Sequence, residues 1–300
     1  MFIVKNKHIF FAVTGVVVVA AILSIAVFRL HLGIDFTGGT LVEVRYDGTR
    51  PDAGALTTTL NNAGFSGFSL RESGEDGYML RTATLSDEQR GSLSSTFSYQ
   101  SGTARVEQLT EIGPTIGEEL RNKAFIALAL VLTAILFFIA FAFRKVSQPV
   151  SSWMYGLIAL LTLGFDVLTP IGFFAFLGYL TGAQVDVLFV TAVLTVLGYS
   201  VHDTIVVFDR VRENLSINQE RGKREPFPET AGRSLNQTFV RSMTTSLTTV
   251  LALTALFLLG PDSTRDFSLM LLIGIIAGTY SSIFLATPLL VAVEEWRRKK

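Results

Sequence analysis

Six long apolar stretches are the feature that most constrains how this 300-residue chain can fold. A hydrocarbon core about 30 Å thick needs about 20 helical residues to cross it. Hydrophobic residues make up 49% of the chain and charged residues only 17%, a balance that an ordinary soluble domain rarely shows. The sequence therefore predicts an α-helical polytopic membrane protein with six transmembrane helices. They run roughly from Ile9 to Phe28, Ala124 to Phe143, Ser152 to Leu177, Val185 to Phe208, Ser242 to Leu259 and Phe267 to Val293.

Basic residues at the ends of these stretches predict the orientation of the chain. Lys5 and Lys7 precede the first stretch, Arg144 and Lys145 lie between the second and third, and residues 297–300 form a basic tail. The positive-inside rule then places both termini in the cytoplasm. The first stretch has the length of a retained anchor, because a signal-peptide core is shorter and is followed by a small-residue cleavage site.

The expected organisation has four parts. Residues 1–29 form a cytoplasmic tail and the first transmembrane helix, and residues 30–123 form an extracytoplasmic (periplasmic) domain. Residues 124–293 carry the other five helices, with a cytoplasmic loop at 209–241, and residues 294–300 form the basic cytoplasmic tail. Residues 29–123 hold nine basic and thirteen acidic residues, whereas the loop holds seven basic and five acidic residues, in agreement with this orientation.

The outside domain shows alternating strand and helix patterns. Period-two alternation indicates a strand from Leu41 to Tyr46, and Ser86 is a helix cap with Glu88 and Gln89 in the first turn. The remaining segments are helices at 52–63 and 86–97 and strands at 68–71, 78–82 and 104–109. This βαββαβ order predicts a ferredoxin-like α+β domain with four antiparallel strands.

Composition gives no support to several kinds of chemistry. The chain has no cysteine, three histidines without a zinc-binding spacing and zero net charge, so we expect no metal, no cofactor and no nucleic-acid partner. A phosphate-binding loop is not expected either, because neither GxxxxGK[ST] nor GxGxxG in its fold context occurs. We therefore expect no enzyme activity.

Three segments together resemble the SecF family of membrane subunits. The first is Gly33-Ile34-Asp35-Phe36-Thr37-Gly38-Gly39, the second runs from Gly198 to Asn214 as GYSVHDTIVVFDRVREN, and the third runs from Ser234 to Ser242 as SLNQTFVRS. The segment GPTIG at 113–117 is similar to the family's exit from its first periplasmic domain. His202 and Phe165 depart from the family pattern, in which asparagine and histidine are more common.

The resemblance implies a function and partners. A SecF-like subunit forms a heterodimer with SecD in a bacterial plasma membrane, belongs to the resistance-nodulation-division superfamily, and works beside the SecYEG channel. The implied function is to use the proton motive force to promote export of translocating, unfolded polypeptide. In the first segment, Gly33, Asp35, Phe36, Gly38 and Gly39 are the family motif, and the glycines are expected to give the backbone freedom for a tight entry into the first strand.

Ionisable residues at membrane depth are the candidate proton pathway. Asp203 precedes the end of the fourth span, Arg241 opens the fifth at the same depth, and Asp166 lies in the middle of the third. A carboxylate at such a depth costs about 2.5–3.5 kcal/mol unless it is partnered, so we expect Asp203 and Arg241 to face each other between the two helices. Their pairing is either a structural salt bridge or a protonation switch, and Asp166 either joins them or makes a local bond.

Five further residues are supporting polar candidates. Ser200 and Thr204 lie near Asp203 on the fourth span, and Thr245 shares the helix face of Arg241; these hydroxyls either relay protons or pack between helices. His202 either titrates or makes an interhelix hydrogen bond. Asp209 is expected to belong to an interfacial charge cluster with Arg210 and Arg212.

Three other functions remain as alternatives. A proton-driven exporter of small molecules or lipids would share such helices, although members of that class usually carry two outside loops. An intramembrane aspartyl protease would need Asp166 and Asp203 to share a proton, which Arg241 disfavours. A passive scaffold would leave the buried charges without a purpose.

Overall fold

The computed structural model describes residues 2–98, 103–143, 150–223 and 225–299. Six candidate membrane spans occur in this part of the chain, in agreement with the predicted number. Arg144, Lys145 and Lys300, three of the basic residues used to predict orientation, lie outside the described residues. The chain divides into two compact units, one of residues 1–29, 127–176 and 189–300, and one of residues 30–126 with 177–188.

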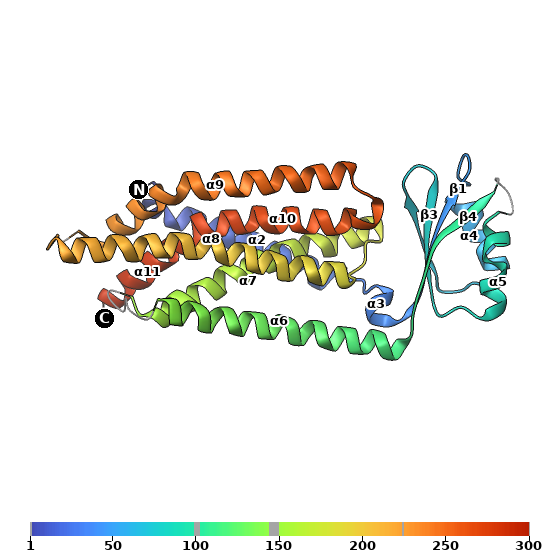
Figure 1. Ribbon diagram of the computed structural model, residues 1–300, viewed down its shortest axis with the longest axis horizontal. Coiled ribbons are helices and arrows are strands. Elements are labelled where there is room, and N and C mark those ends of the chain that lie inside the picture. Colours follow the sequence, from blue (N-terminus) through green and yellow to red (C-terminus); the bar gives the residue numbers. More distant parts are fainter. Residues whose placement is uncertain (1, 99–102, 144–149, 224, 300) are drawn as a thin grey trace. The chain divides into compact units, whose positions relative to one another are not determined.

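The first unit is a helical bundle (Figure 1). A short helix, α1 (Phe2–Lys5), precedes the first span. The six spans are formed by α2 (Lys7–Phe28), α6 (Pro114–Ala142), α7 (Ser152–Thr181), α8 (Val187–Glu220), α9 (Phe227–Leu259) and α10 to α11 (Arg265–Ser281 and Thr287–Arg298), with a 3₁₀ turn η1 (Asp262–Thr264) before α10.

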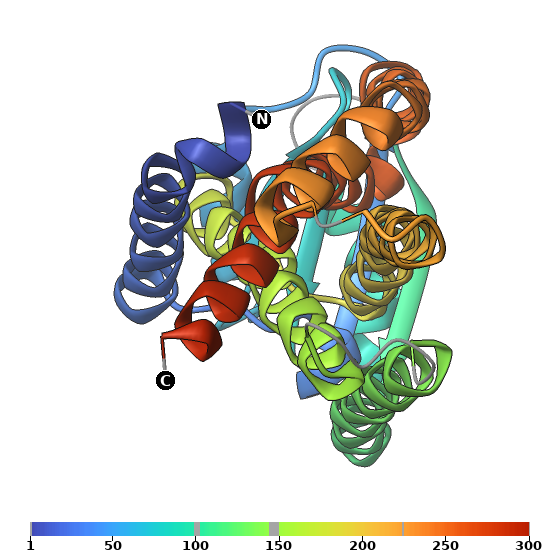
Figure 2. The same cartoon turned by 90° about the vertical axis from the view of Figure 1, so that its left-hand side faces the viewer.

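The helices of the bundle differ in how deeply they are buried. In the most apolar window of α7, α8 and the last span, 50%, 44% and 61% of the residues are buried, whereas the value is 11% for α2, α6 and α9. The view along the bundle in Figure 2 shows α2 and α6 at its periphery. A bundle centred on α7, α8 and α10 therefore leaves wide apolar faces on the other helices, as expected for a protein in lipid.

Small residues allow the helices to approach closely. A Cβ atom added to Gly172 of α7 would lie 2.5 Å from the Cα atom of Ala21, and the hydroxyl of Ser24 donates to the Gly172 carbonyl at 2.6 Å. In the same way a Cβ atom on Gly278 of α10 would lie 3.0 Å from Cβ of Ser200 on α8. Close backbone approach of this kind replaces the hydrophobic effect as the source of helix association in membranes.

The last span contains a local change of helix type. A π-helical turn, η2 (Ser282–Ala286), separates α10 from α11, and Pro288 lies at the start of α11. Proline has no backbone N–H and its ring displaces the preceding carbonyl, so the regular α-helical pattern is interrupted one turn before it.

The second unit contains the predicted four-stranded domain. Its elements are α3 (Ile34–Thr37), β1 (Gly39–Tyr46), α4 (Ala53–Asn62), β2 (Ser69–Ser73), β3 (Gly77–Thr82), α5 (Asp87–Phe97) and β4 (Ala104–Ile112). The strands pair antiparallel in the order β2-β3-β1-β4, which confirms the ferredoxin-like prediction. Ser86 caps α5 through a capping box with Gln89, also as predicted.

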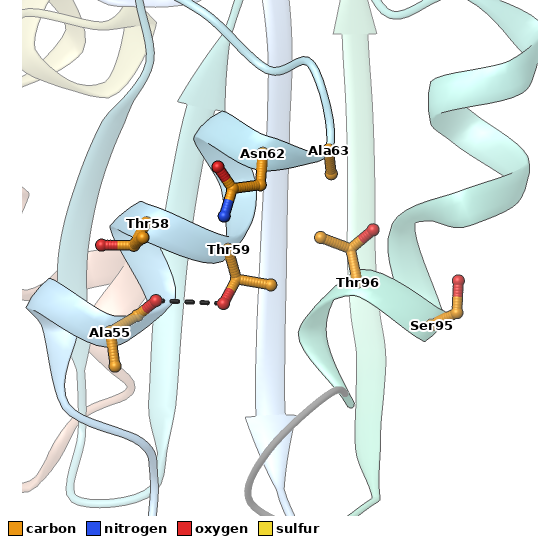
Figure 3. Close-up of a pocket in the computed structure, with 7 residues that line it drawn as sticks. All are labelled: Ala55, Thr58, Thr59, Asn62, Ala63, Ser95 and Thr96. Atoms are coloured by element: carbon orange, nitrogen blue, oxygen red, sulfur yellow. Dashed lines mark hydrogen bonds between the residues drawn. The ribbon is translucent and has the colours of Figure 1, made fainter.

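The alternation of β1 determines which face of the sheet is covered. Val42, Val44 and Tyr46 are buried against residues of both helices, such as Leu60 and Phe97. An open groove of about 710 Å³ lies between α4 and α5, and Figure 3 shows that small, uncharged side chains line it. The groove is lined by Ala55, Thr58, Thr59, Asn62, Ala63, Ser95 and Thr96. None of these residues is ionisable, so the groove offers no acid–base chemistry.

The region expected as the cytoplasmic loop, residues 209–241, is mostly helical. α8 continues to Glu220 and α9 begins at Phe227. Hydropathy marks where a chain leaves the apolar layer, whereas a helix continues for as long as its polar residues find partners. Here the two helices bond to each other along this polar section.

Candidate functional site

The packing of α8 against α9 follows one antiparallel register, which five side-chain contacts define. Tyr199 and Thr249 approach to 3.3 Å, and Asp203 accepts from Ser246 at 3.5 Å. Further along the hairpin the contacts are Arg210 with Gln237, Asn214 with Ser234, and Asn218 with Thr230. Contacts further along α8 are therefore matched by contacts about equally far back along α9, and Asp203 lies opposite Ser246.

This register separates Asp203 from Arg241. Asp203 is 4% exposed, whereas Arg241 is exposed and lies about one helical turn nearer the hairpin bend. Within the described ranges no direct ion pair joins the two side chains, and Arg241 interacts with Asp203 electrostatically at longer range. Ser246, which the sequence analysis did not single out, is the residue of α9 that bonds to Asp203. Hydropathy does not single out a serine, so only the register of α8 against α9 identifies Ser246 as the partner of Asp203.

Asp166 lies beside α8 in the same buried region. It is fully buried, and its Oδ2 accepts a hydrogen bond from Ser200, which is one helical turn before Asp203. Its other oxygen, Oδ1, has no hydrogen-bond partner among the described residues. Pro170, four residues further on, has no N–H to donate to the Asp166 carbonyl. Asp166, Ser200 and Asp203 thus form a buried polar cluster, and in the described part of the chain no basic side chain forms an ion pair with it.

The other candidates differ in where they point. Thr204 is 1% exposed and its hydroxyl has no partner in the described part of the chain. Thr245 is exposed and donates to the Arg241 carbonyl at 2.9 Å, so it does not contact Asp203. His202 is also exposed. Asp209 pairs with Arg212 at 2.8 Å, one of the two arginines expected near it, whereas Arg210 pairs with Glu213.

The glycine-rich segment before β1 has a structural role. Gly38 and Gly39 have φ values of 75° and 132°, which confirms the expected need for backbone freedom. A Cβ atom on Gly38 would also lie 2.8 Å from the backbone of Pro114. Gly33 donates its N–H to the Val185 carbonyl at 2.7 Å.

Asp35 in this segment has a partner that the sequence did not predict. Its Oδ2 accepts from the backbone N–H of Val187, the first residue of α8, at 2.8 Å. A carboxylate at that position accepts a hydrogen bond from an otherwise free helical N–H, and its negative charge is attracted to the positive end of the helix dipole. The motif therefore joins the entry to β1 to the start of a helix about 150 residues later.

A polar network closes the far end of the α8–α9 hairpin. Glu225 accepts from Arg233 at 2.6 Å and from Asn218 and Thr230 at 2.8 and 2.9 Å. The hydrogen bond from Arg233 is the main reason why the pKa of Glu225 is lowered to about 2. This side chain therefore stays ionised under all physiological conditions and acts as a structural anchor.

Two family models match most of the chain between them. Residues 93–296 match the family described as "Protein export membrane protein SecD/SecF, C-terminal", and residues 23–49 match the "SecD/SecF GG Motif". The chain belongs to the SecD/SecF family. The second match contains the glycine-rich segment around Asp35, and the first contains Asp166, Asp203 and Arg241.

Relatives of the SecD/SecF family are similar over almost the whole chain. "Protein translocase subunit SecF" of Thermobaculum terrenum is 38% identical over 97% of this chain and 93% of its own length. The SecF subunit of Pseudomonas aeruginosa is 33% identical over 95% of this chain and 89% of its own. A fused SecDF subunit of Thermus thermophilus is 35% identical over 90% of this chain but only 35% of its own length.

Solved structures show the same fold. A crystal structure of SecDF, described as a translocon-associated membrane protein, from Thermus thermophilus superposes with a TM-score of 0.85 at 32% identity. The match covers 97% of this chain and 38% of that one. A SecDF structure in a "Super-membrane-facing form" gives a TM-score of 0.69. This chain thus spans well under half of the fused protein.

Proposed function

We propose that this multi-pass membrane protein is the SecF-type half of an accessory complex that uses the proton motive force to promote protein export. Its partner is a SecD subunit, and the complex draws unfolded polypeptide outward after it leaves the SecYEG channel. The membrane is the bacterial plasma membrane, with both termini in the cytoplasm. The relatives over nearly full length are named as translocase subunits, which favours this function over a small-molecule or lipid exporter.

The observation that carries the proposal is the buried cluster of Asp166, Ser200 and Asp203. Two carboxyl groups lie inside the helical bundle with hydroxyl partners, and among the described residues neither is ion-paired with a basic side chain. Such groups are costly in a membrane and commonly belong to proton relays. Proton uptake by Asp203 changes the charge between α8 and α9, and thereby the preferred packing of these helices.

An unusual exposed face supports the need for a membrane partner. On α8 the exposed residues include Thr195, Gly198 and His202, and on α9 they include Thr244 and Thr248. We call these five residues the polar face. The three threonine hydroxyls donate to carbonyls of their own helix, but the imidazole of His202 is costly in hydrocarbon, so a second protein rather than lipid is expected to cover this face. The fused SecDF relative supplies the nature of that protein.

The available energy sets the number of protons per step. One charge that crosses ~100 mV releases ~2.3 kcal/mol. Moving a two-state equilibrium from 1:99 to 99:1 takes ~5.5 kcal/mol. A complete conformational step therefore needs more than one proton at that voltage, or a pH gradient in addition.

Asp203→Asn tests the proposal directly. The substitution keeps the shape of the side chain and removes its titration, so proton-dependent stimulation of export is expected to be lost while the protein still inserts and binds its partner. The measurements are accumulation of an exported precursor in cells and the abundance of the variant in membranes. Export at the normal rate with normal abundance would show that Asp203 has only a structural role.

A further inference from the structure

Five hydroxyl side chains form a continuous row along the buried face of α9. They recur at every fourth residue and are all less than 10% exposed. We call this row the hydroxyl ladder; it consists of Thr230, Ser234, Thr238, Ser242 and Ser246.

Both ends of the ladder are bonded to α8. Thr230 accepts from Asn218 at 3.1 Å, and Ser234 accepts from Asn214 at 2.8 Å. At the other end Ser246 donates to Asp203 at 3.5 Å. The ladder therefore follows the seam between the two helices from the polar hairpin to the candidate proton-carrying carboxylate.

Ser242 is the member of the ladder whose buried hydroxyl is not explained by helix packing. It is 1% exposed, and its Oγ has no hydrogen-bond partner among the described residues. Close helix packing needs only a small side chain, and alanine would provide it without burying an unbonded hydroxyl at a cost in stability. Ser242 lies one helical turn from Ser246 and one from Thr238, so its hydroxyl faces the gap between them.

Thr238, the next member of the ladder, lies at a cavity. Thr238 lines a cavity of about 290 Å³ between α8 and α9, together with Arg241 and Gln237 of α9 and Val206, Asp209, Arg210 and Glu213 of α8. Both carboxylates are exposed, and each is paired with an arginine, Asp209 with Arg212 and Glu213 with Arg210. The cavity is thus charged and accessible to water, whereas Asp203 lies two turns further in.

We propose that this cavity is the cytoplasmic mouth of the proton path and that Ser242 is the positioning residue that connects it to Asp203. The proposal rests on the proposed function, because it presupposes that Asp203 carries protons. A serine hydroxyl donates one hydrogen bond and accepts others. The hydroxyl of Ser242 is therefore able to bridge the Ser246 hydroxyl and water that enters past Thr238.

The transfer conserves protons and needs no co-reactant. The O–H bond of protonated Asp203 breaks as its proton passes to the neighbouring hydroxyl or water. That group releases its own proton toward the cavity, and the hydroxyl of Ser242 then rotates back. Charged and titratable groups lie along this route. Arg210 on α8 and Arg241 on α9 line the cavity, His202 lies beside Asp203, and the ion-paired Asp209 and Glu213 lie at the mouth.

Proton flux into proteoliposomes tests the role of the hydroxyl. The vesicles contain the complex with its SecD partner and an internal pH-sensitive dye, and a pH gradient is imposed. Ser242→Ala is expected to slow the flux at least about tenfold. Ser242→Thr retains the hydroxyl and is expected to restore most of it. Ser268→Ala is the matched control, because Ser268 is a fully buried serine of α10 that bonds to the Thr264 carbonyl at 2.7 Å.

The same assay separates this inference from the proposed function. If Asp203→Asn abolishes flux and Ser242→Ala equals the wild type, the ladder is only a packing seam. If Asp203→Asn leaves flux unchanged, the proposed proton path through Asp203 is itself wrong. Equal loss of flux in Ser242→Ala and Ser242→Thr, with normal assembly, would also overturn the role of the hydroxyl.

Water access provides a test that does not depend on flux. The chain contains no cysteine, so Ser242→Cys introduces a unique thiol. A small, charged methanethiosulfonate reagent added from the cytoplasmic side is expected to modify it. Leu235→Cys, at a position of α9 that is 1% exposed within an apolar cluster, is expected to remain unmodified. Protection of both thiols to the same degree would exclude a water-filled mouth that reaches Ser242.

Discussion

Single residues at the site show where sequence reasoning succeeded and where it failed. Hydropathy was sufficient to place Asp166 and Asp203 within candidate membrane spans, and both are buried next to hydroxyl groups. It did not predict their partners, because partner choice depends on the register of α8 against α9. That register is defined by hydrogen bonds along the hairpin, such as those of Asn214 and Asn218, and it puts Ser246 opposite Asp203.

The position of Arg241 leads to a prediction about its chemistry. Its guanidinium group lines the cavity and makes no direct bond to Asp203, so its charge is expected to matter more than its planar fork of donors. Arg241→Lys is expected to retain flux within about twofold, whereas Arg241→Gln, which removes the charge, is expected to reduce it about tenfold. Proton flux in proteoliposomes measures both. Equal impairment by the two substitutions would show that the guanidinium geometry is required.

Asp35 supports a second prediction at this scale. Its bond to the N–H of Val187 caps α8, and loss of a helix cap costs about 0.5–2 kcal/mol. Asp35→Ala is therefore expected to increase amide hydrogen exchange in the first turn of α8, at residues 187–190. Asp47→Ala is a suitable control, because Asp47 pairs only with the exposed Arg105. Unchanged exchange in Asp35→Ala would mean that the cap contributes nothing.

Among the elements, the α8–α9 hairpin departs most from the sequence prediction. The expected loop of residues 209–241 is almost entirely helical, because asparagine, serine and threonine side chains bond across the seam and satisfy one another. The strands were predicted to within about three residues, since period-two alternation directly reflects the two faces of a sheet. A polar hairpin has no comparable periodic signal.

The network at the hairpin bend makes the stability of this element depend on pH. Because the folded pKa of Glu225 is lowered to about 2, its ion pair with Arg233 contributes fully above the ordinary glutamate pKa of about 4.3. That contribution is lost as the pH falls from about 4 through about 2. Hydrogen exchange at residues 225–235, corrected for intrinsic rates, is expected to show protection decreasing over this window.

Glu225→Gln isolates this contribution at neutral pH. The variant is expected to lose about 1–2 kcal/mol of local stability, seen as faster exchange at the bend. Glu220→Gln is the matched control, because Glu220 has a single neutral partner, Ser216, at 3.2 Å. If both variants exchange equally, the Glu225 network does not anchor the hairpin.

At the scale of the whole molecule, the polar face of α8 and α9 predicts the position of the partner subunit. Thr248 belongs to this face, whereas Leu130 is a 63% exposed apolar residue on a different helix, α6. Thr248→Cys is therefore expected to cross-link to single cysteines in membrane helices of SecD, and Leu130→Cys is not. Cross-linking of both positions, or of Leu130→Cys alone, would place the partner elsewhere. The natural chain contributes no background, because it has no cysteine.

The polar face also has a consequence for how cells manage this protein. A copy synthesised without its partner would present the imidazole ring of His202 to the acyl chains, which is costly in hydrocarbon and is expected to favour removal of the unassembled chain. The lifetime of the chain is then set by assembly. Its cellular amount would follow the supply of the partner more closely than the strength of its own gene expression.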